Sequence, residues 1–442
     1  MQNKKSTIKT ILMAVLVIIT SSCAKELDLV PESGVSPDQI NAGNINFFLN
    51  GLYRRSMPER DNYVLQDVRG GNYTWTALSG SNSAYGVLIT GDNVDDRLSF
   101  SASLWTHAYR NIYNANVIIE AVDRLGGAGN LQKVKAEACY LRAYLYYQLV
   151  TNFGGVPLIL TNTTENIPRN PAAEVWNQIL IDIDFAIANA DPFQTTGIKK
   201  ISVEAAQAFK SRVLLALDRK EEAATLAAST ISALESRAID ANYGRIFRNT
   251  DASSEVIFAF SNLVTESNIR MSSLFWPYGT EWAGSYFVQP STYAINELYQ
   301  VNDVRRNVNI QDVPSADGVL TIVSKYWDVQ PMVISRLSEL YLICAEGFGM
   351  ANGLQYLNEL RQARGLAPRA AADFQTAGSY LDEVLQERRR ELYSEGFLFY
   401  DLVRTDKAID LPNVRTRAHY LLPLPGAQVN LSENVLEQND SY

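Results

Sequence analysis

The stretch SVEAAQAFKSRVLLALDRKEEAATLAASTISALE, residues 202–235, decides the fold. Apolar residues recur at spacings of three and four up to Leu217, and Asp218-Arg219-Lys220 then forms a short polar turn before an alanine-rich run. This periodicity predicts two amphipathic helices, over 202–217 and 221–235, with small residues where they cross. A helix, a tight turn and a second helix form the repeating unit of tetratricopeptide-type solenoids.

Similar periodic segments lie on both sides of this pair. Ser36-Pro37-Asp38 is typical of a helix start, with a hydroxyl cap followed by proline and an acid. No strict 34-residue period connects the segments, so the predicted array is degenerate. We therefore expect a mainly α fold, a tetratricopeptide-like scaffold of helical pairs with long irregular loop insertions and little β structure. Further helices are predicted over 104–125, 133–150, 171–190, 336–349, 353–366 and 381–405.

Two stretches lack a lasting helical period and are predicted to be insertions. Residues 58–101 are rich in Gly, Asn and Ser, and residues 240–335 are irregular apart from a candidate strand at 255–260. The domain organisation that follows is a signal peptide over 1–22, a tether over 23–35 and one helical domain over 36–442. That domain divides into a helical part (36–239), the loop-rich insertion (240–335) and a second helical part (336–442).

The N-terminus has the pattern of an export signal. Three lysines precede the apolar run ILMAVLVII at 11–19, which is too short to span a bilayer, and small residues then lead to Cys23. A cysteine there resembles the lipobox of bacterial lipoproteins, although Thr20 stands where leucine is usual. We expect Cys23 to be lipidated. The alternative is a plain secretory signal with a chance cysteine.

Composition excludes several classes of protein. The 442 residues carry 39 Lys+Arg against 48 Asp+Glu, a net charge of −9 that falls to −12 without the leader. This acidic balance argues against nucleic-acid binding. Two histidines and three cysteines, far apart in sequence, argue against a zinc cluster. No nucleophile elbow, P-loop or H-E-x-x-H motif is present, so we expect no catalytic residues, no metal and no cofactor.

Residues with reactive side chains have structural interpretations. His107, Cys139 and Cys344 lie on apolar helices and are predicted to be buried and inert. In ERRRE, residues 387–391, we expect the pairs Glu387–Arg390 and Arg388–Glu391 rather than a nucleic-acid contact. The acidic loop residues Asp92, Asp95 and Asp96 match no complete calcium loop, and we expect them to cap the loop and face solvent.

Aromatic residues beside Gly and Pro in the insertions are the sharpest functional signal. A flat indole or phenol ring can cover the C–H face of a sugar, while polar neighbours bond its hydroxyls. We expect such rings to be more exposed than helical aromatics and to contact a ligand. The alternative is that they pack the loops or contact a partner protein. The candidate ligand-binding residues are Tyr73, Trp75, Asn82, Trp276, Tyr278, Trp282 and Tyr286.

Several segments in one order carry a resemblance that covers nearly the whole chain. No single segment is specific, but the series resembles the SusD/RagB family of outer-membrane nutrient-binding lipoproteins. One mild departure is Leu424, between two prolines, where the family often has isoleucine. The segments are Cys23, W…Y..I..AN at 105–116, 136–158, 208–223, 336–347, 357–366, 387–404, LPLP at 422–425 and the terminal Gln438-Asn439-Asp440.

The resemblance implies a binding protein rather than an enzyme. It implies a lipid-anchored, surface-exposed location on the cell outer membrane and delivery of an oligosaccharide to a SusC-like TonB-dependent transporter, which the lipoprotein caps as a lid. The acidic stretch after Cys23 also resembles a surface-export signal. The alternatives are peptide capture by the same fold, a surface glycoside hydrolase that uses Asp92, Asp95 or Asp96, and a scaffold whose aromatics serve only the transporter.

Overall fold

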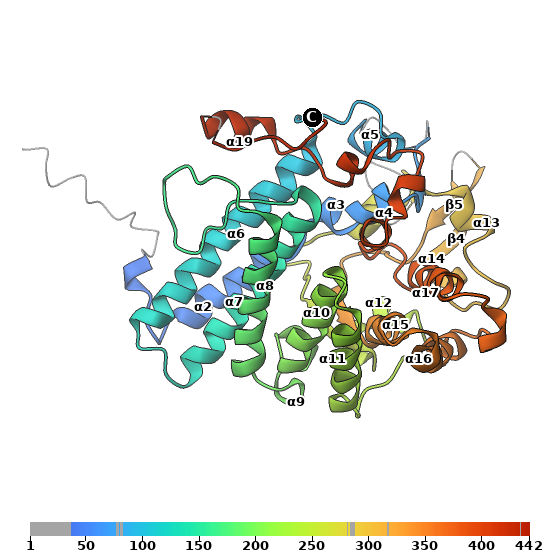
Figure 1. The fold of residues 1–442 in the computed structure, drawn as a ribbon, viewed down its shortest axis with the longest axis horizontal. Coiled ribbons are helices and arrows are strands. Elements are labelled where there is room, and N and C mark those ends of the chain that lie inside the picture. Colours follow the sequence, from blue (N-terminus) through green and yellow to red (C-terminus); the bar gives the residue numbers. More distant parts are fainter. Residues whose placement is uncertain are drawn as a thin grey trace, which may run out of the picture.

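The computed structural model confirms a mainly helical protein, with 56% helix and 8% strand. Long helices form a curved array, and the strands of the described residues lie in three separate two-stranded sheets. Figure 1 shows α2, α6 and α7 at one end of this array and α15, α16 and α17 at the other. The structure describes residues 37–76, 79, 83–280, 282, 288–315, 318–433 and 435–442.

Each long helix packs on the next one in the array. The order of contact is α6, α7, α8, α10, α11, α15 and α16, so the helix pair on either side of the central insertion continues the same stack. The helices run over α6 (Ser99–Arg124), α7 (Asn130–Phe153), α8 (Ala172–Asn189), α10 (Val203–Ala216), α11 (Lys220–Ala233), α15 (Leu337–Gly347) and α16 (Gly349–Ala363).

The helix pair over 202–235 forms as predicted, and its second helix packs closely on α15. Ser202 caps α10 by accepting a hydrogen bond from the Ala205 amide at 2.9 Å, and Asp218 turns the chain with a φ of +58°. A Cβ atom on Gly347 of α15 would lie 2.2 Å from the Lys220 carbonyl oxygen and 2.7 Å from the Ala224 Cβ. The array therefore needs glycine at this crossing of α11 and α15.

The structure corrects three boundaries. The helix expected at Pro37 is a single 3-10 turn, and the α-helix begins at Ile45. The insertion over 58–101 contains short helices. The helix expected over 381–405 is two helices, because Ser394 and Gly396 between them have φ values of +64° and +82°. These elements are η1 (Pro37–Gln39), α2 (Ile45–Ser56), α3 (Arg60–Tyr63), α4 (Leu65–Arg69), α5 (Ser83–Thr90), α17 (Ala377–Glu391) and α18 (Leu398–Arg404).

The other short helical elements follow the connections between the long helices. They are α9 (Phe193–Thr196), η3 (Gly197–Lys199), α12 (Arg245–Arg248), η4 (Thr250–Ala252), η5 (Met271–Leu274), α13 (Thr292–Asn296), α14 (Arg306–Asn309), η6 (Ala371–Asp373), η7 (Ala408–Asp410), η8 (Arg417–Tyr420) and α19 (Gly426–Leu431). Within the described ranges, no helix combines the length and the apolar character needed to cross a membrane.

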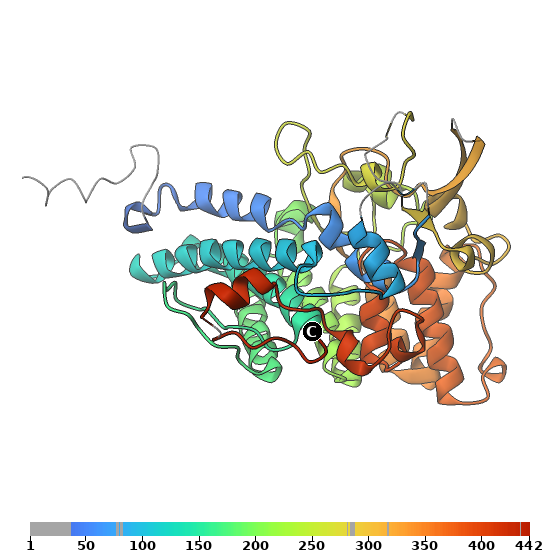
Figure 2. The same ribbon diagram turned by 90° about the horizontal axis from the view of Figure 1, so that it is seen from above.

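All three sheets are antiparallel pairs that involve the central insertion. The strand expected at 255–260 is confirmed as β2 (Val256–Phe260), which pairs with β6 (Met332–Arg336) inside the core. β1 (Tyr73–Thr74) pairs with β3 (Gln289–Pro290), so the two predicted insertions meet. β4 (Ile310–Ser315) and β5 (Gly318–Val323) form a hairpin that projects from the molecule in Figure 2.

A network of buried charges joins the central insertion to the C-terminal helices. Arg336 at the end of β6 donates to Glu255 at 2.7 Å and to Glu391 at 2.5 Å. Arg364 donates to the same two carboxylates, at 2.7 and 2.8 Å, and Arg305 donates to Glu391 at 2.9 Å. These five side chains are at most 2% exposed. Because each charge has partners, the network fixes how the insertion sits on α16 and α17.

Two ion pairs were predicted within residues 387–391 of α17, and one of them forms. Glu387 and Arg390 pair at 3.0 Å, as expected. The expected Arg388–Glu391 pair is wrong, because Arg388 pairs with Asp401 of α18 at 2.9 Å while Glu391 lies in the buried network. The spacing along one helix could not reveal that a later turn brings α18 against it.

We expect Gly347→Ala to destabilise the protein by about 1–3 kcal/mol, because the new methyl group overlaps the backbone of α11. Gly51→Ala in α2 is the matched control, since a Cβ there meets nothing within 4 Å, and we expect it to stabilise by about 0.5–1 kcal/mol. Urea unfolding of both variants measures the difference. Equal effects of the two substitutions would contradict close packing at Gly347.

We expect Glu391→Gln to lower the free energy of unfolding by about 3 kcal/mol or more at pH 7, because it leaves buried arginines undercompensated. Burial alone would raise the pKa of Glu391, but Arg364 and Arg336 outweigh it and hold the pKa well below its usual range. The stabilisation is therefore present above the unfolded-state pKa and is lost as the pH falls below about 4. Unfolding curves from pH 7 to pH 3 should show the wild type and the variant converging.

The exposed pair Arg219–Glu222 supplies the control for this substitution. Glu222→Gln should change stability far less than Glu391→Gln does at any of these pH values, because solvent screens an exposed pair. A similar small effect at Glu391 would mean that the network does not hold the insertion in place.

Candidate functional site

The two loop-rich insertions meet on one side of the helical array. In the short sheet, Tyr73 lies opposite Pro290 and Thr74 opposite Gln289, and the Thr76 hydroxyl donates to the Gln289 side-chain oxygen at 2.7 Å. Arg60 donates to Ser273 Oγ at 2.7 Å and joins the same two insertions a second time. Figure 2 shows the loops of the central insertion and the β4–β5 hairpin on one side of the array and α19 on the other.

Tyr73 is not an exposed aromatic, contrary to expectation. Its side chain is 2% exposed, its ring packs against Phe275 and Tyr393, and its hydroxyl donates to Ser394 Oγ at 2.7 Å. Burial raises the pKa of Tyr73 well above its ordinary value. A period of two along β1 points its ring into the core, and we therefore leave Tyr73 out of the ligand surface proposed below.

Trp75 lies beyond β1 and is half-buried. Its indole stacks on Tyr85 of α5, with ring centroids 6.1 Å apart and an interplanar angle of 14°. A Cβ atom on Gly86 would lie 3.1 Å from the indole Cδ1, so this glycine makes room for the ring. The stacking holds Trp75 in one orientation while part of its surface stays accessible.

The second aromatic group comes from the central insertion. Trp276 is half-buried, and its Nε1 donates to the Tyr326 carbonyl oxygen at 2.8 Å, which fixes the indole plane. Tyr278 is 88% exposed at the turn made by Pro277 and Gly279, whose φ is +88°. Trp282 is half-buried. The predicted residues Asn82, Tyr286 and Cys23 lie outside the described residues.

Sequence reasoning missed Trp327, which lies one residue after the acceptor of the Trp276 bond. It is 38% exposed, and the Arg248 guanidinium lies 4.5 Å from its ring centroid. Burial lowers the pKa of Arg248 from its ordinary value. The criterion used for the other aromatics, a position near Gly or Pro in an insertion, also applies to Trp327, because it lies in the same insertion four residues before Pro331. We call Trp75, Trp276, Tyr278, Trp282 and Trp327 the loop-aromatic group.

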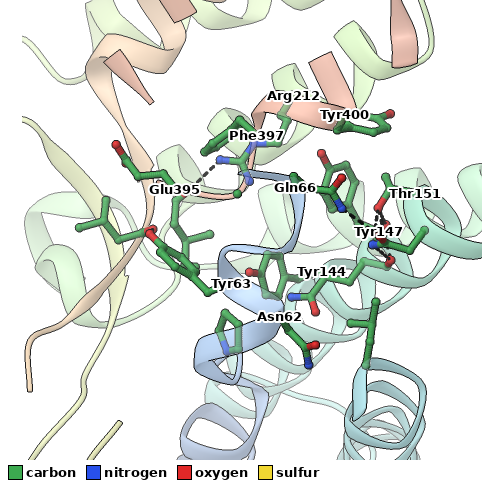
Figure 3. A pocket seen from close by; sticks show the side chains of 17 residues that line it. Asn62, Tyr63, Gln66, Tyr144, Tyr147, Thr151, Arg212, Glu395, Phe397 and Tyr400 are labelled. Carbon is green, nitrogen blue, oxygen red and sulfur yellow. Dashed lines mark hydrogen bonds between the residues drawn. The ribbon is translucent and has the colours of Figure 1, made fainter. Parts of the chain in front are cut away.

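A polar crevice lies deeper in the molecule, between α3, α4, α7 and the segment before α18 (Figure 3). Gln66 donates to the Asn152 side-chain oxygen at 2.9 Å, and Tyr63 donates to the Val333 carbonyl at 2.8 Å. Asn62 Oδ1 and Gln148 Oε1 are buried and have no hydrogen-bond partner among the described residues. The crevice volume of about 70 Å³ suits a few waters and lies far below the ~300–1,000 Å³ of ligand pockets.

A larger cleft lies between α6, the segment 157–167 and α19. Its volume is about 370 Å³, and its apolar lining includes Trp105, Tyr109 and the exposed Leu431. Arg110 and Glu165 line the same cleft with exposed charged side chains. This cleft is of ligand-binding size, and none of the residues predicted to bind ligand line it.

Most of the reactive side chains discussed in the sequence analysis are either buried or paired with a neighbouring residue. Cys139 and Cys344 are buried as predicted, and burial raises the pKa of each thiol to about 12. His107 is 9% exposed, and burial lowers its pKa despite Glu59 at 4.0 Å. Asp92 pairs with Arg415 at 2.7 Å, and Asp95 accepts a hydrogen bond from the Arg97 amide at 2.9 Å. The described residues bring together no group of three metal-binding side chains.

A rigid helical array that displays loop aromatics and a ligand-sized cleft defines a binding protein. Two family models match the chain: one described as "Starch-binding associating with outer membrane" covers residues 27–215, and that of the SusD family covers residues 237–411. The chain belongs to the SusD/RagB family. Proteins of this family bind carbohydrate, are associated with the outer membrane and catalyse no reaction, in agreement with the expectation of a non-enzymatic chain.

Individual relatives are similar along their whole length. SusD-like protein P38 of Formosa agariphila is 25% identical in an alignment that covers all of both chains. A solved laminarin-binding SusD-like protein has a TM-score of 0.77 and 21% identity, over 91% of this chain and 100% of its own. A SusD superfamily protein from Parabacteroides distasonis has a TM-score of 0.78 and 19% identity, over 92% and 100%. At these identities, the solved structures establish the fold alone.

We expect Tyr73→Phe to cost about 1 kcal/mol of stability and to leave glycan affinity unchanged, because the substitution removes one buried hydrogen bond and no exposed surface. Thermal unfolding and titration with laminarin oligosaccharides measure the two effects. A selective loss of affinity in a fully folded variant would return Tyr73 to the ligand site.

Proposed function

We propose that this protein binds an oligosaccharide on the loop-aromatic group and delivers it to a SusC-like TonB-dependent transporter. The observation that carries the proposal is the meeting of the two insertions, each of which holds tryptophan side chains at the surface by stacking or by a hydrogen bond. Rings fixed in this way lose little conformational freedom when a sugar stacks on them.

The chemistry of the surroundings suits a neutral or weakly polar glycan. Tyr278 offers an exposed phenol ring, and Trp327 offers an indole edge beside the Arg248 guanidinium. Sugar C–H faces would cover the rings, and guanidinium, amide and hydroxyl groups would bond the sugar hydroxyls. The related laminarin-binding protein and the starch-binding family description support a glucan as the first class of ligand to test.

The proposed location of the protein is the cell outer membrane, where it would be held by a lipid. A lipid on Cys23 would anchor the chain at the outer membrane, and residues 24–35 would act as a tether, so that the domain reaches the mouth of the transporter. The family's association with the outer membrane supports this arrangement.

Peptide capture is the second candidate, and the cleft beside α19 favours it. This cleft combines an apolar lining with Arg110 and Glu165, which match the opposite charges of a short peptide with apolar side chains. Leu431, 72% exposed at this cleft, provides a variant that separates the two candidates.

We expect Tyr278→Ala to weaken binding of laminarin or malto-oligosaccharides about 5–10-fold, since a lost stacking ring costs roughly 1 kcal/mol. The side chain is 88% exposed, so the fold should be unaffected. Calorimetric titration of the mature protein with both glycans and a mixed tripeptide panel measures the affinities.

Leu431→Glu is the control, because it alters the cleft beside α19 and leaves the loop-aromatic group unchanged. It should not change glycan affinity. Loss of tripeptide binding in Leu431→Glu, with no glycan bound by the wild type, would replace the glycan proposal with peptide capture.

A further inference from the structure

Arg69, the last residue of α4, is a buried cation without a carboxylate partner among the described residues. Its residue is 4% exposed. One terminal nitrogen, Nη2, donates to the carbonyl oxygens of His419 and Tyr420 at 2.9 and 3.1 Å. The other, Nη1, is buried and has no hydrogen-bond partner in the part of the chain that the structure describes. Such an arrangement is costly, because a buried charge is normally paired.

Two other buried arginines each have a carboxylate partner, which Arg69 lacks among the described residues. Arg142 pairs with Asp182 at 2.7 Å, and Arg212 pairs with Glu339 at 2.6 Å. Arg69 has instead the face of the Phe399 ring, 3.9 Å from its guanidinium carbon. Desolvation lowers its pKa to about 10, which leaves it charged at neutral pH. The ring compensates part of this charge, and Nη1 still lacks an acceptor.

A small cavity lies beside this guanidinium. Its volume is about 20 Å³, and its lining includes Leu88, Gly91, Asn413 and Leu422. A space of this size admits one particle of about the size of water and excludes sulfate or phosphate. Asp92, the residue after Gly91, is exposed and pairs with Arg415 at 2.7 Å.

We propose that this cavity binds a single monatomic anion, chloride, against Arg69 Nη1. Chloride satisfies both deficits at once, because it accepts the orphan hydrogen bond and supplies the missing negative charge. A water molecule would satisfy only the first.

The anion would join segments that are far apart in sequence. Asn413 donates to the carbonyl oxygens of Arg69 and Leu88, each at 2.9 Å, so the cavity wall connects α4, α5 and the C-terminal segment. α5 also carries Tyr85, on which Trp75 stacks. Chloride would therefore stabilise the segments that support Trp75.

The test compares unfolding temperatures in sodium chloride and in sodium gluconate at equal ionic strength. We expect the difference between the two salts to be about 2 °C larger, in favour of chloride, for the wild type than for Arg69→Met. Arg124→Met is the matched control, because Arg124 also donates to backbone carbonyls but is exposed. It should keep the wild-type difference.

A second measurement does not depend on a folded variant. Crystals of the wild-type protein soaked in sodium bromide should show an anomalous peak within hydrogen-bond distance of Arg69 Nη1. The proposal is overturned if the cavity holds water without bromide, or if Arg69→Met keeps the full chloride effect, which would place the anion elsewhere.

Discussion

The buried pairing of Glu391 with Arg336, Arg364 and Arg305 is the constraint on which the rest of the structure depends. The helical array is held by apolar contacts along neighbouring helices, whereas the central insertion consists of short strands and short helices joined by loops. Because apolar contact is non-directional, it would allow the insertion many positions on α16 and α17. Charged hydrogen bonds of 2.5–2.9 Å between residues at most 2% exposed are directional, and they select one position.

Short stretches of chain connect these buried charges to tryptophans at the surface. Arg336 ends β6, and Lys325, bonded to Glu395 at 2.6 Å, precedes Tyr326 and Trp327. Tyr326 in turn accepts the Trp276 indole N–H. Trp327 is thus two residues along the chain from the buried Lys325, and Trp276 is hydrogen-bonded to the residue between them. Trp75 is fixed separately, by β1–β3 pairing and by stacking on Tyr85. The proposed ligand-binding loops are therefore held by buried hydrogen bonds, by ring stacking and by one short strand pair.

The sequence was sufficient for the helical array because each long helix carries its own periodicity, as 202–235 shows. It was insufficient wherever a contact joined distant segments. Glu391 was assigned to Arg388 because spacing along one helix was the available geometry, yet its partners come from residues 305, 336 and 364. Tyr73 was expected at the surface because Gly70 and Gly71 precede it, but pairing with β3 buries its ring. Trp327 was missed although its surroundings met the same criterion.

The buried arginines hold loops in two different ways. Arg336 and Arg364 meet carboxylates encoded in the chain, so their contribution is fixed at neutral pH. Arg69 holds the His419–Tyr420 segment through backbone carbonyls and an aromatic ring, which supply dipoles but no net negative charge. Desolvation makes this unmatched charge costly, and the proposed chloride would balance it. The insertion that carries Trp276 is thus held by the sequence itself, whereas the support of Trp75 depends in part on the composition of the solution.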